Sequence, residues 1–112
     1  MTGIAFAPEF GSCQFKTITV TDTATTLAAL WATAGGTALS TLAATKGYLH
    51  AIIFPEANVR YDPAGGTPTA TVGLQFTAST TYTFENQNRM LQTMKLIREG
   101  GANVSVQVAI FY

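Results

Sequence analysis

The feature that most constrains the fold is a strict alternation at the end of the chain, in NVSVQVAIFY (103–112). Every second residue there is large and apolar: Val104, Val106, Val108, Ile110 and Tyr112. Successive side chains of a strand point to opposite faces, so this segment is predicted to be a β-strand with one buried face. The preceding EGGAN (99–103) holds two adjacent glycines that favour a turn, so MKLIR (94–98) is predicted to be the other arm of a hairpin.

Further short strands are predicted upstream, from β-branched and aromatic residues and from alternation. They are KTITV (16–20), GYLHAIIFP (47–55), a strand end in VRY (59–61), GLQFTA (73–78) and TYTFE (81–85). The 47–55 segment is apolar on both faces, which predicts a central strand, covered on both sides and ended by Pro55. Apolar residues at helical spacing between 86 and 94 predict one or two helical turns.

These elements predict an all-β fold, an antiparallel β-sandwich or jelly roll with at most short helical turns. A chain of 112 residues has room for one core, so we expect an N-terminal arm over 1–15 and a single β-sandwich domain over 16–112. The Ala- and Thr-rich segment 23–45 stays open, because TTLAALW fits a short helix or a strand and AGGT breaks the pattern.

Charge is scarce and balanced. Six basic and six acidic residues cancel, and charged residues make up 11% of the chain, against about 25% in an average domain. Without excess positive charge the chain lacks the attraction through which nucleic-acid binders gather phosphate. It also lacks the repulsion that keeps monomers apart, so we expect a homo-oligomer and no nucleic-acid partner. The uncharged 23–45 segment is too rich in Thr, Ala and Gly to predict a membrane span.

Few residues are suited to catalysis or metal binding. His50 is the single histidine and lies in the most apolar segment, where a buried structural histidine is the simpler interpretation. One histidine cannot assemble the multi-imidazole metal site of a cupin. Cys13 is the single cysteine, and we expect a buried or inert thiol. The carboxylates are too scattered for an acid–base pair, so we predict no catalytic, cofactor-binding or metal-binding residue and no enzyme.

The most chemically suggestive stretch is VRYDPAGGTPTATVG (59–73). Its two glycines lead into a Thr-Pro pair and a strand, whereas a phosphate-binding loop needs a following lysine and a helix. A strand end, a Pro/Gly turn and a second strand account for more of its residues. Arg60, Tyr61 and Asp62 are then candidates for contact with another protein, because Arg and Tyr at a sheet edge are common interface anchors.

The N-terminal arm is a second candidate contact. Large apolar side chains near a chain end are costly to leave in water, so we expect them to lie against another protein. The candidates are Ile4, Phe6 and Phe10, together with Pro8 and Phe15.

Several of these segments taken together are similar to a known class of protein. V-R-Y (59–61), T-P-T-A (67–70) with Gly73, the M-K-L-I-R arm (94–98) with its glycine turn, and the alternating strand 104–112 resemble small β-rich structural proteins of tailed bacteriophages and prophages. The similarity covers about the C-terminal two-thirds of the chain.

This resemblance implies a virion component, in particular a capsid cement or decoration protein that stabilises contacts between capsid subunits, with no enzymatic activity and no cofactor. It implies the major capsid protein or other virion proteins as partners. The expected location is the capsid surface of the virion, after synthesis in the bacterial host cytoplasm. The N-terminal third departs from the short lead-in of such proteins, which leaves the mode of attachment open between capsid and tail.

An alternative is a tail- or fibre-associated β-sandwich module that binds carbohydrate or a receptor. Aromatic faces flanked by Asn, Gln and Thr are a common way to bind sugars. This alternative predicts exposed aromatic side chains, first among them Tyr61 and Trp31.

Overall fold

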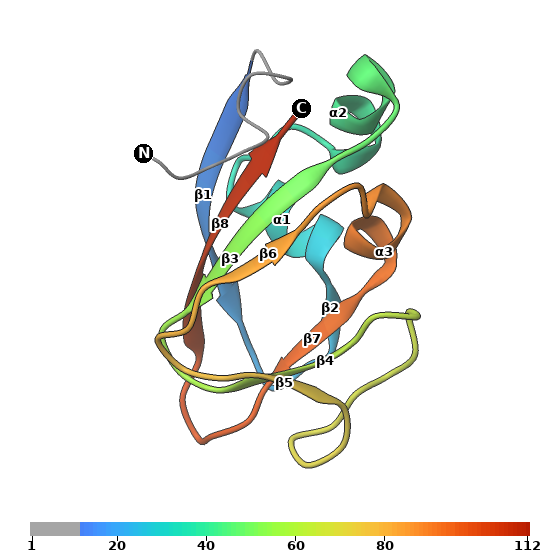
Figure 1. Ribbon diagram of the computed structural model, residues 1–112. Helices are drawn as coiled ribbons and strands as arrows, with labels where there is room; N and C mark the ends of the chain where they lie inside the picture. The colour runs from blue at the N-terminus through green and yellow to red at the C-terminus, as the bar shows by residue number, and fades with distance from the viewer. Residues whose placement is uncertain (1–11) are drawn as a thin grey trace.

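A computed structural model of the 112-residue chain describes residues 12–112. This part forms two four-stranded antiparallel sheets with three short helices (Figure 1). The strands are β1 (Cys13–Val20), β2 (Thr25–Thr26), β3 (His50–Pro55), β4 (Val59–Asp62), β5 (Leu74–Phe76), β6 (Tyr82–Phe84), β7 (Lys95–Arg98) and β8 (Val104–Phe111). The helices are α1 (Leu27–Thr33), α2 (Leu39–Lys46) and α3 (Asn88–Thr93). The predicted β-rich chain with short helices is confirmed.

The first sheet, called sheet A, has the strand order β1-β8-β3-β6, and the second, sheet B, has the order β2-β7-β4-β5. The predicted hairpin of 94–98 with the final strand is therefore wrong, because β7 and β8 lie in different sheets. The long strands β1 and β8 pair over their whole length, from Cys13 opposite Phe111 to Val20 opposite Val104. The strand predicted over 16–20 therefore begins earlier, at Cys13. The alternation of β8 is confirmed, because its buried and half-buried side chains follow one another without a break.

Strand β3 lies between β8 and β6, so its predicted central position in a sheet is confirmed. Its two faces are not equally covered, however. Ala51 and Ile53 are fully buried, whereas Ile52 and Phe54 on the opposite face are only partly buried. The helices gather on one side of sheet A, where they cover the face that carries Ala51 and Ile53 (Figure 1).

The open segment 23–45 contains both a strand and helices. Thr25 and Thr26 pair with β7, and the Thr26 hydroxyl then caps α1 by accepting the backbone N–H of Ala29 at 3.1 Å. Trp31 lies fully buried on α1, and its indole N–H donates to the carbonyl oxygen of Thr37 at 2.7 Å. This bond folds the chain sharply between α1 and α2, so closely that Gly36 has no room for a side chain beside the indole.

The core lies between the two sheets and the helices. Inward side chains of β1, β3 and β8 meet apolar residues of all three helices and of sheet B. Its largest fully buried members are Trp31, Phe76, Ile18, Leu27, Leu39, Leu49, Ile53, Leu91, Met94, Leu96 and Ile110. None of the helices in residues 12–112 is long and apolar enough to cross a membrane.

Candidate functional site

The stretch 59–73 folds as the strand end and turn that its sequence predicts. Val59–Asp62 is β4, and the loop that follows is ordered by its own polar groups. The Asp62 carboxylate accepts the backbone N–H of Ala64 at 2.8 Å, and the Thr69 hydroxyl accepts that of Val72 at 3.0 Å. The backbones of Thr69 and Val72 also bond to each other, which closes the tip of the loop. The loop contains no lysine and leads into strand β5 rather than into a helix, so it lacks the pattern of a phosphate-binding loop.

Arg60 takes part in a network on the outer face of sheet B. Its Nε lies 2.6 Å from Glu99 Oε2, and its Nη1 donates to the carbonyl oxygen of Gly73 at 3.1 Å. Glu99 also accepts hydrogen bonds from the side-chain amides of Gln75 (2.7 Å) and Asn58 (3.2 Å). The bond from Gln75 contributes most to lowering the pKa of Glu99, and those from Asn58 and Arg60 add to it, against an opposing effect of desolvation. Asn58, Arg60, Gln75 and Glu99 are called the Glu99 network below.

Tyr61 points to the other face of β4, toward the core. Its ring stacks on the buried Phe76, with centroids 3.9 Å apart and planes 8° from parallel, and Tyr82 packs on the same phenyl ring at 4.8 Å. Burial raises the pKa of the Tyr61 hydroxyl, and the neighbouring Tyr82 adds to this. Arg60, Tyr61 and Asp62 therefore do not form one patch, and each has a partner within its own chain. Contact of these residues with another protein stays a prediction.

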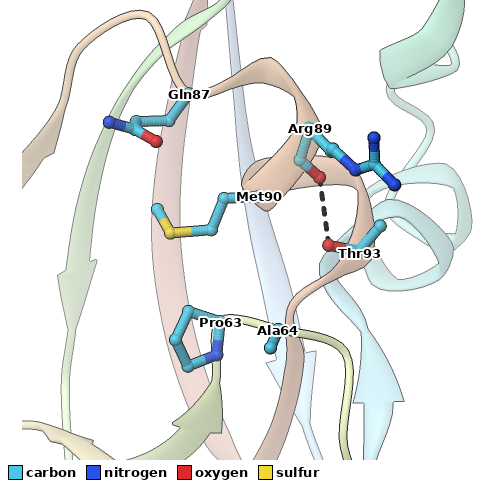
Figure 2. Close-up of a pocket in the computed structure, with 6 residues that line it drawn as sticks. All are labelled: Pro63, Ala64, Gln87, Arg89, Met90 and Thr93. Carbon is cyan, nitrogen blue, oxygen red and sulfur yellow. Dashed lines mark hydrogen bonds between the residues drawn. The ribbon is translucent and has the colours of Figure 1, made fainter.

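A hollow of about 480 Å³ lies between the loop after β4 and helix α3 (Figure 2). Pro63, Ala64 and Met90 supply apolar surface, and Gln87 and Arg89 supply polar groups at its border. Figure 2 shows the Arg89 guanidinium pointing away from Met90 and Pro63, while the hydroxyl of Thr93 donates to the Arg89 carbonyl oxygen at 3.0 Å. The volume is in the range of small-ligand sites, but this lining offers hydrogen bonds and apolar contact rather than a nucleophile or a proton-transfer group.

The outward side of sheet A is the most unusual surface of the described chain. Buried and exposed side chains alternate along its strands, so the residues opposite the core form one face. This outer face of sheet A consists of Cys13, Phe15, Thr17, Thr19, His50, Ile52, Phe54, Thr83, Ser105, Gln107, Ala109 and Phe111. None of these residues is charged. Phe15 is 59% exposed, although a large apolar side chain gains free energy from burial.

A second apolar exposure lies on the loop 67–74. Val72 is 64% exposed and Leu74 is 55% exposed, at the start of the edge strand β5. Both belong to a run from Pro63 to Phe84 that contains no charged residue. Exposed apolar side chains in an uncharged surface are typical of contacts with other proteins.

The two residues considered for chemistry are kept apart by the fold. His50 is buried, and its ring meets the Tyr48 ring edge-on at 5.7 Å. Of the two expectations for Cys13, a buried or an inert thiol, the buried alternative is wrong because the residue is exposed. Partial desolvation raises the pKa of its thiol. Both residues stand opposite Phe111, on the two sides of β8, which separates their backbones by about 10 Å. A thiolate–imidazolium pair is therefore not formed. Across residues 12–112, no three His, Cys, Asp or Glu side chains come together as metal ligands.

The remaining predicted residues divide between the core and the undescribed segment. Trp31 is fully buried, so the expectation that it is exposed for sugar binding is wrong. Ile4, Phe6 and Phe10 lie outside the described residues. The sequence reasoning missed the Glu99 network and the outer face of sheet A. The odd-numbered positions of β1 carried a signal for that face, because Phe15 alternates with inward residues on the same strand.

Comparison of the chain with protein-family models, with curated proteins and with solved structures finds no match.

Proposed function

We propose that this protein is a non-enzymatic structural component of a bacteriophage virion, a capsid cement or decoration protein of the β-sandwich or jelly-roll class. In this role it lies over joints between capsid subunits, with the major capsid protein as its partner. The observation that carries the proposal is the uncharged outer face of sheet A with its exposed Phe15. The resemblance of the C-terminal two-thirds of the chain to phage structural proteins is the reason for proposing a virion as its location.

The physical argument starts from the cost of that face in water. Apolar side chains gain about 25 cal/mol for each Å² removed from solvent, and a face without charges loses little hydration energy when it is covered. Interface cores are depleted of charged residues and enriched in aromatic ones, as this face is. The exposed Val72 and Leu74 offer a second contact of the same chemistry.

The deciding experiment is to locate the chain in particles from its source. Peptide mass spectrometry measures its copy number, and cryo-electron microscopy shows its position. Many copies on the capsid support the proposal, and a few copies at one vertex place the chain at a tail or connector instead. Absence of the chain from purified particles overturns it.

The role of the N-terminal arm in attachment to the capsid is tested separately. A chain that lacks residues 1–12 should bind purified capsids more weakly than the full chain, because Ile4, Phe6 and Phe10 are then lost. The Glu9→Gln variant of the full chain keeps these side chains and is the matched control. Equal binding by the truncated and full chains contradicts the arm as an attachment element.

A second candidate function is carbohydrate or receptor binding on a tail or fibre. It is favoured by the hollow beside α3 and by the partly exposed Tyr61 and Tyr82 rings near the ends of β4 and β6. NMR titration of the labelled protein with a panel of host polysaccharides should then shift the signals of Met90 and Tyr61. No shift with any member of the panel contradicts this candidate.

A further inference from the structure

We propose that the outer face of sheet A receives residues 4–10 of a second copy of this chain, so that neighbouring copies are linked through their N-terminal segments. This inference deepens the structural role proposed above and rests on it for its setting. It assigns the exposed face to a second copy and leaves the exposed Val72 and Leu74 for contact with the capsid. The occupant is the segment that the sequence identifies as costly to leave in water.

The first support is the pattern of the segment itself. Its large apolar residues occupy every second position: Ile4, Phe6, Pro8 and Phe10. Between them stand Ala5, Ala7 and Glu9, so an extended segment presents one wholly apolar side and keeps its single charge on the other. Pro8 suits an extended backbone but has no N–H, which excludes it from the middle of a sheet ladder. The segment is therefore suited to lie on a surface through its side chains.

The second support is the match between that side and the outer face of sheet A. Phe15, Ala109 and Ile52 stand side by side on β1, β8 and β3, and Phe54 follows two residues along β3. Strands are about 4.8 Å apart, so this row extends over about 10 Å. No charged residue interrupts the row, and Glu9 of the docked segment would point to solvent. An apolar side thus meets an apolar face without burying an unpaired charge.

The third support is the direction in which the described chain leaves the sheet. The carbonyl oxygen of Ser12 accepts the backbone N–H of Tyr112 at 3.2 Å, which continues the β1–β8 ladder one residue beyond Cys13. This bond holds Ser12 at the end of the sheet. To lie on the outer face of its own sheet A, the chain before Ser12 would have to reverse direction, and the turn would take up residues of the 4–10 segment. Docking on a neighbour needs no such turn. Seven extended residues span about 23 Å, close to the length of an eight-residue strand.

The experiment uses two variants of the full chain that each lose one partner of the contact. Phe6→Ser with Phe10→Ser removes the apolar side of the segment, and Phe15→Ser removes the exposed aromatic residue of the face. Self-association is measured by light scattering and sedimentation over a range of concentrations. Each variant should associate at least about tenfold more weakly than the unaltered chain, because central aromatic residues dominate interface affinity. Val72→Ser, which removes an equally exposed apolar side chain elsewhere, should associate like the unaltered chain.

Mixing the two variants gives the sharpest outcome. The Phe6→Ser/Phe10→Ser variant keeps an unaltered face, and the Phe15→Ser variant keeps an unaltered segment. A mixture of the two should therefore form a one-to-one dimer and no larger assembly. An unaltered chain that stays monomeric overturns the inference, as does unchanged association of both variants or a mixture that forms no pair. Circular dichroism checks the fold of each variant, and Thr17→Lys on the same face replaces Phe15→Ser if that variant is unfolded.

No particles are used in these measurements, so their failure is distinct from failure of the proposed function. If the chain is found in many copies on capsids but is monomeric in solution, and the two variants do not pair, only the inferred link between copies is wrong. A chain that pairs in solution but is absent from particles overturns only the structural role.

Discussion

The outward faces of the two sheets have opposite chemistry. That of sheet B carries Arg60, Asp62 and Lys95 on its strands, with Glu99 just beyond β7, and the Glu99 network joins its charges and amides within the chain. The outward face of sheet A has no charged residue on its strands, with Glu56 just beyond β3 accepting a hydrogen bond from Gln107, and it exposes Phe15. Sheet B therefore joins several of its polar groups within the chain, whereas sheet A leaves the apolar side chain of Phe15 exposed. Substitutions on the first face should change stability, and substitutions on the second should change association.

The largest effect is expected in the core that both sheets share. A methyl group on Gly36 would overlap the buried indole of Trp31, which is fixed by its hydrogen bond to Thr37. Gly36→Ala should lower the free energy of unfolding by about 3 kcal/mol, as overpacking does at rigid sites. Urea denaturation measures this. Gly100→Ala is the control and should change it by less than about 0.5 kcal/mol, because open space surrounds Gly100. Equal effects of the two substitutions would show that Trp31 is not fixed.

The next effect should come from the polar face of sheet B. Asn58 accepts the backbone N–H of Ala78 at 2.8 Å and donates to Glu99 at 3.2 Å, so it ties the chain before β4 to the chain after β5. Asn58→Ala should cost about 2 kcal/mol, since a hydrogen bond contributes about 1 kcal/mol. Asn103→Ala removes one bond at an exposed turn, and thermal unfolding should show a smaller loss. A smaller loss for Asn58→Ala than for its control contradicts the importance of this tie.

A modest pH dependence should also arise on sheet B. Hydrogen bonds from Gln75 and its neighbours lower the pKa of Glu99 in the folded state, so the stabilisation is complete above the ordinary carboxyl pKa of about 4.3. It is lost as the pH falls through the lowered pKa. The stability difference between the unaltered chain and Glu99→Gln, measured by urea denaturation, should therefore be larger at pH 7 than in strong acid. A difference that does not change with pH would mean that the ionised carboxylate is not favoured by its neighbours.

The smallest effect on stability is expected on sheet A, where the effect on association should be large. Thr17 is exposed on the outer face, so Thr17→Lys should change the free energy of unfolding by less than about 0.5 kcal/mol. The added charge should nevertheless weaken binding to capsids or to other copies, because it must be desolvated on contact. Thr41→Lys on α2 adds the same charge elsewhere and should leave binding unchanged. Equal binding by both variants would remove the distinction between the two faces.

Much of the fold could be predicted because β-strand alternation is a local signal. The strand at 104–111, the central position of β3 and the short helix α3 all follow from residues that are neighbours in sequence. The segment 23–45 could not be settled in this way, because Ala and Thr are compatible with both structures. The helix there begins at a local cap, Thr26, but it depends on the docking of Trp31 in the core, which is a tertiary contact.

The candidate site was less predictable for the same reason. The partner of Arg60 is Glu99, 39 residues away, and no local pattern identifies it. Without this partner Arg60 resembles an interface anchor, and with it the side chain has a structural role in sheet B. For Cys13 the general preference of thiols predicts a buried or inert residue, although its odd-numbered position on β1 puts it on the same side as Phe15.

The position of Cys13 provides a natural labelling site from which covering of the outer face of sheet A can be measured. The sequence contains one cysteine, and its thiol is exposed at the end of the outer face of sheet A. A thiol-reactive dye would therefore attach at one known place, without any substitution elsewhere. Labelling calls for mildly alkaline buffer, because the raised pKa leaves little thiolate at neutral pH. Protection of this thiol from the dye would then report, in solution or on a particle, when the face beside it is covered.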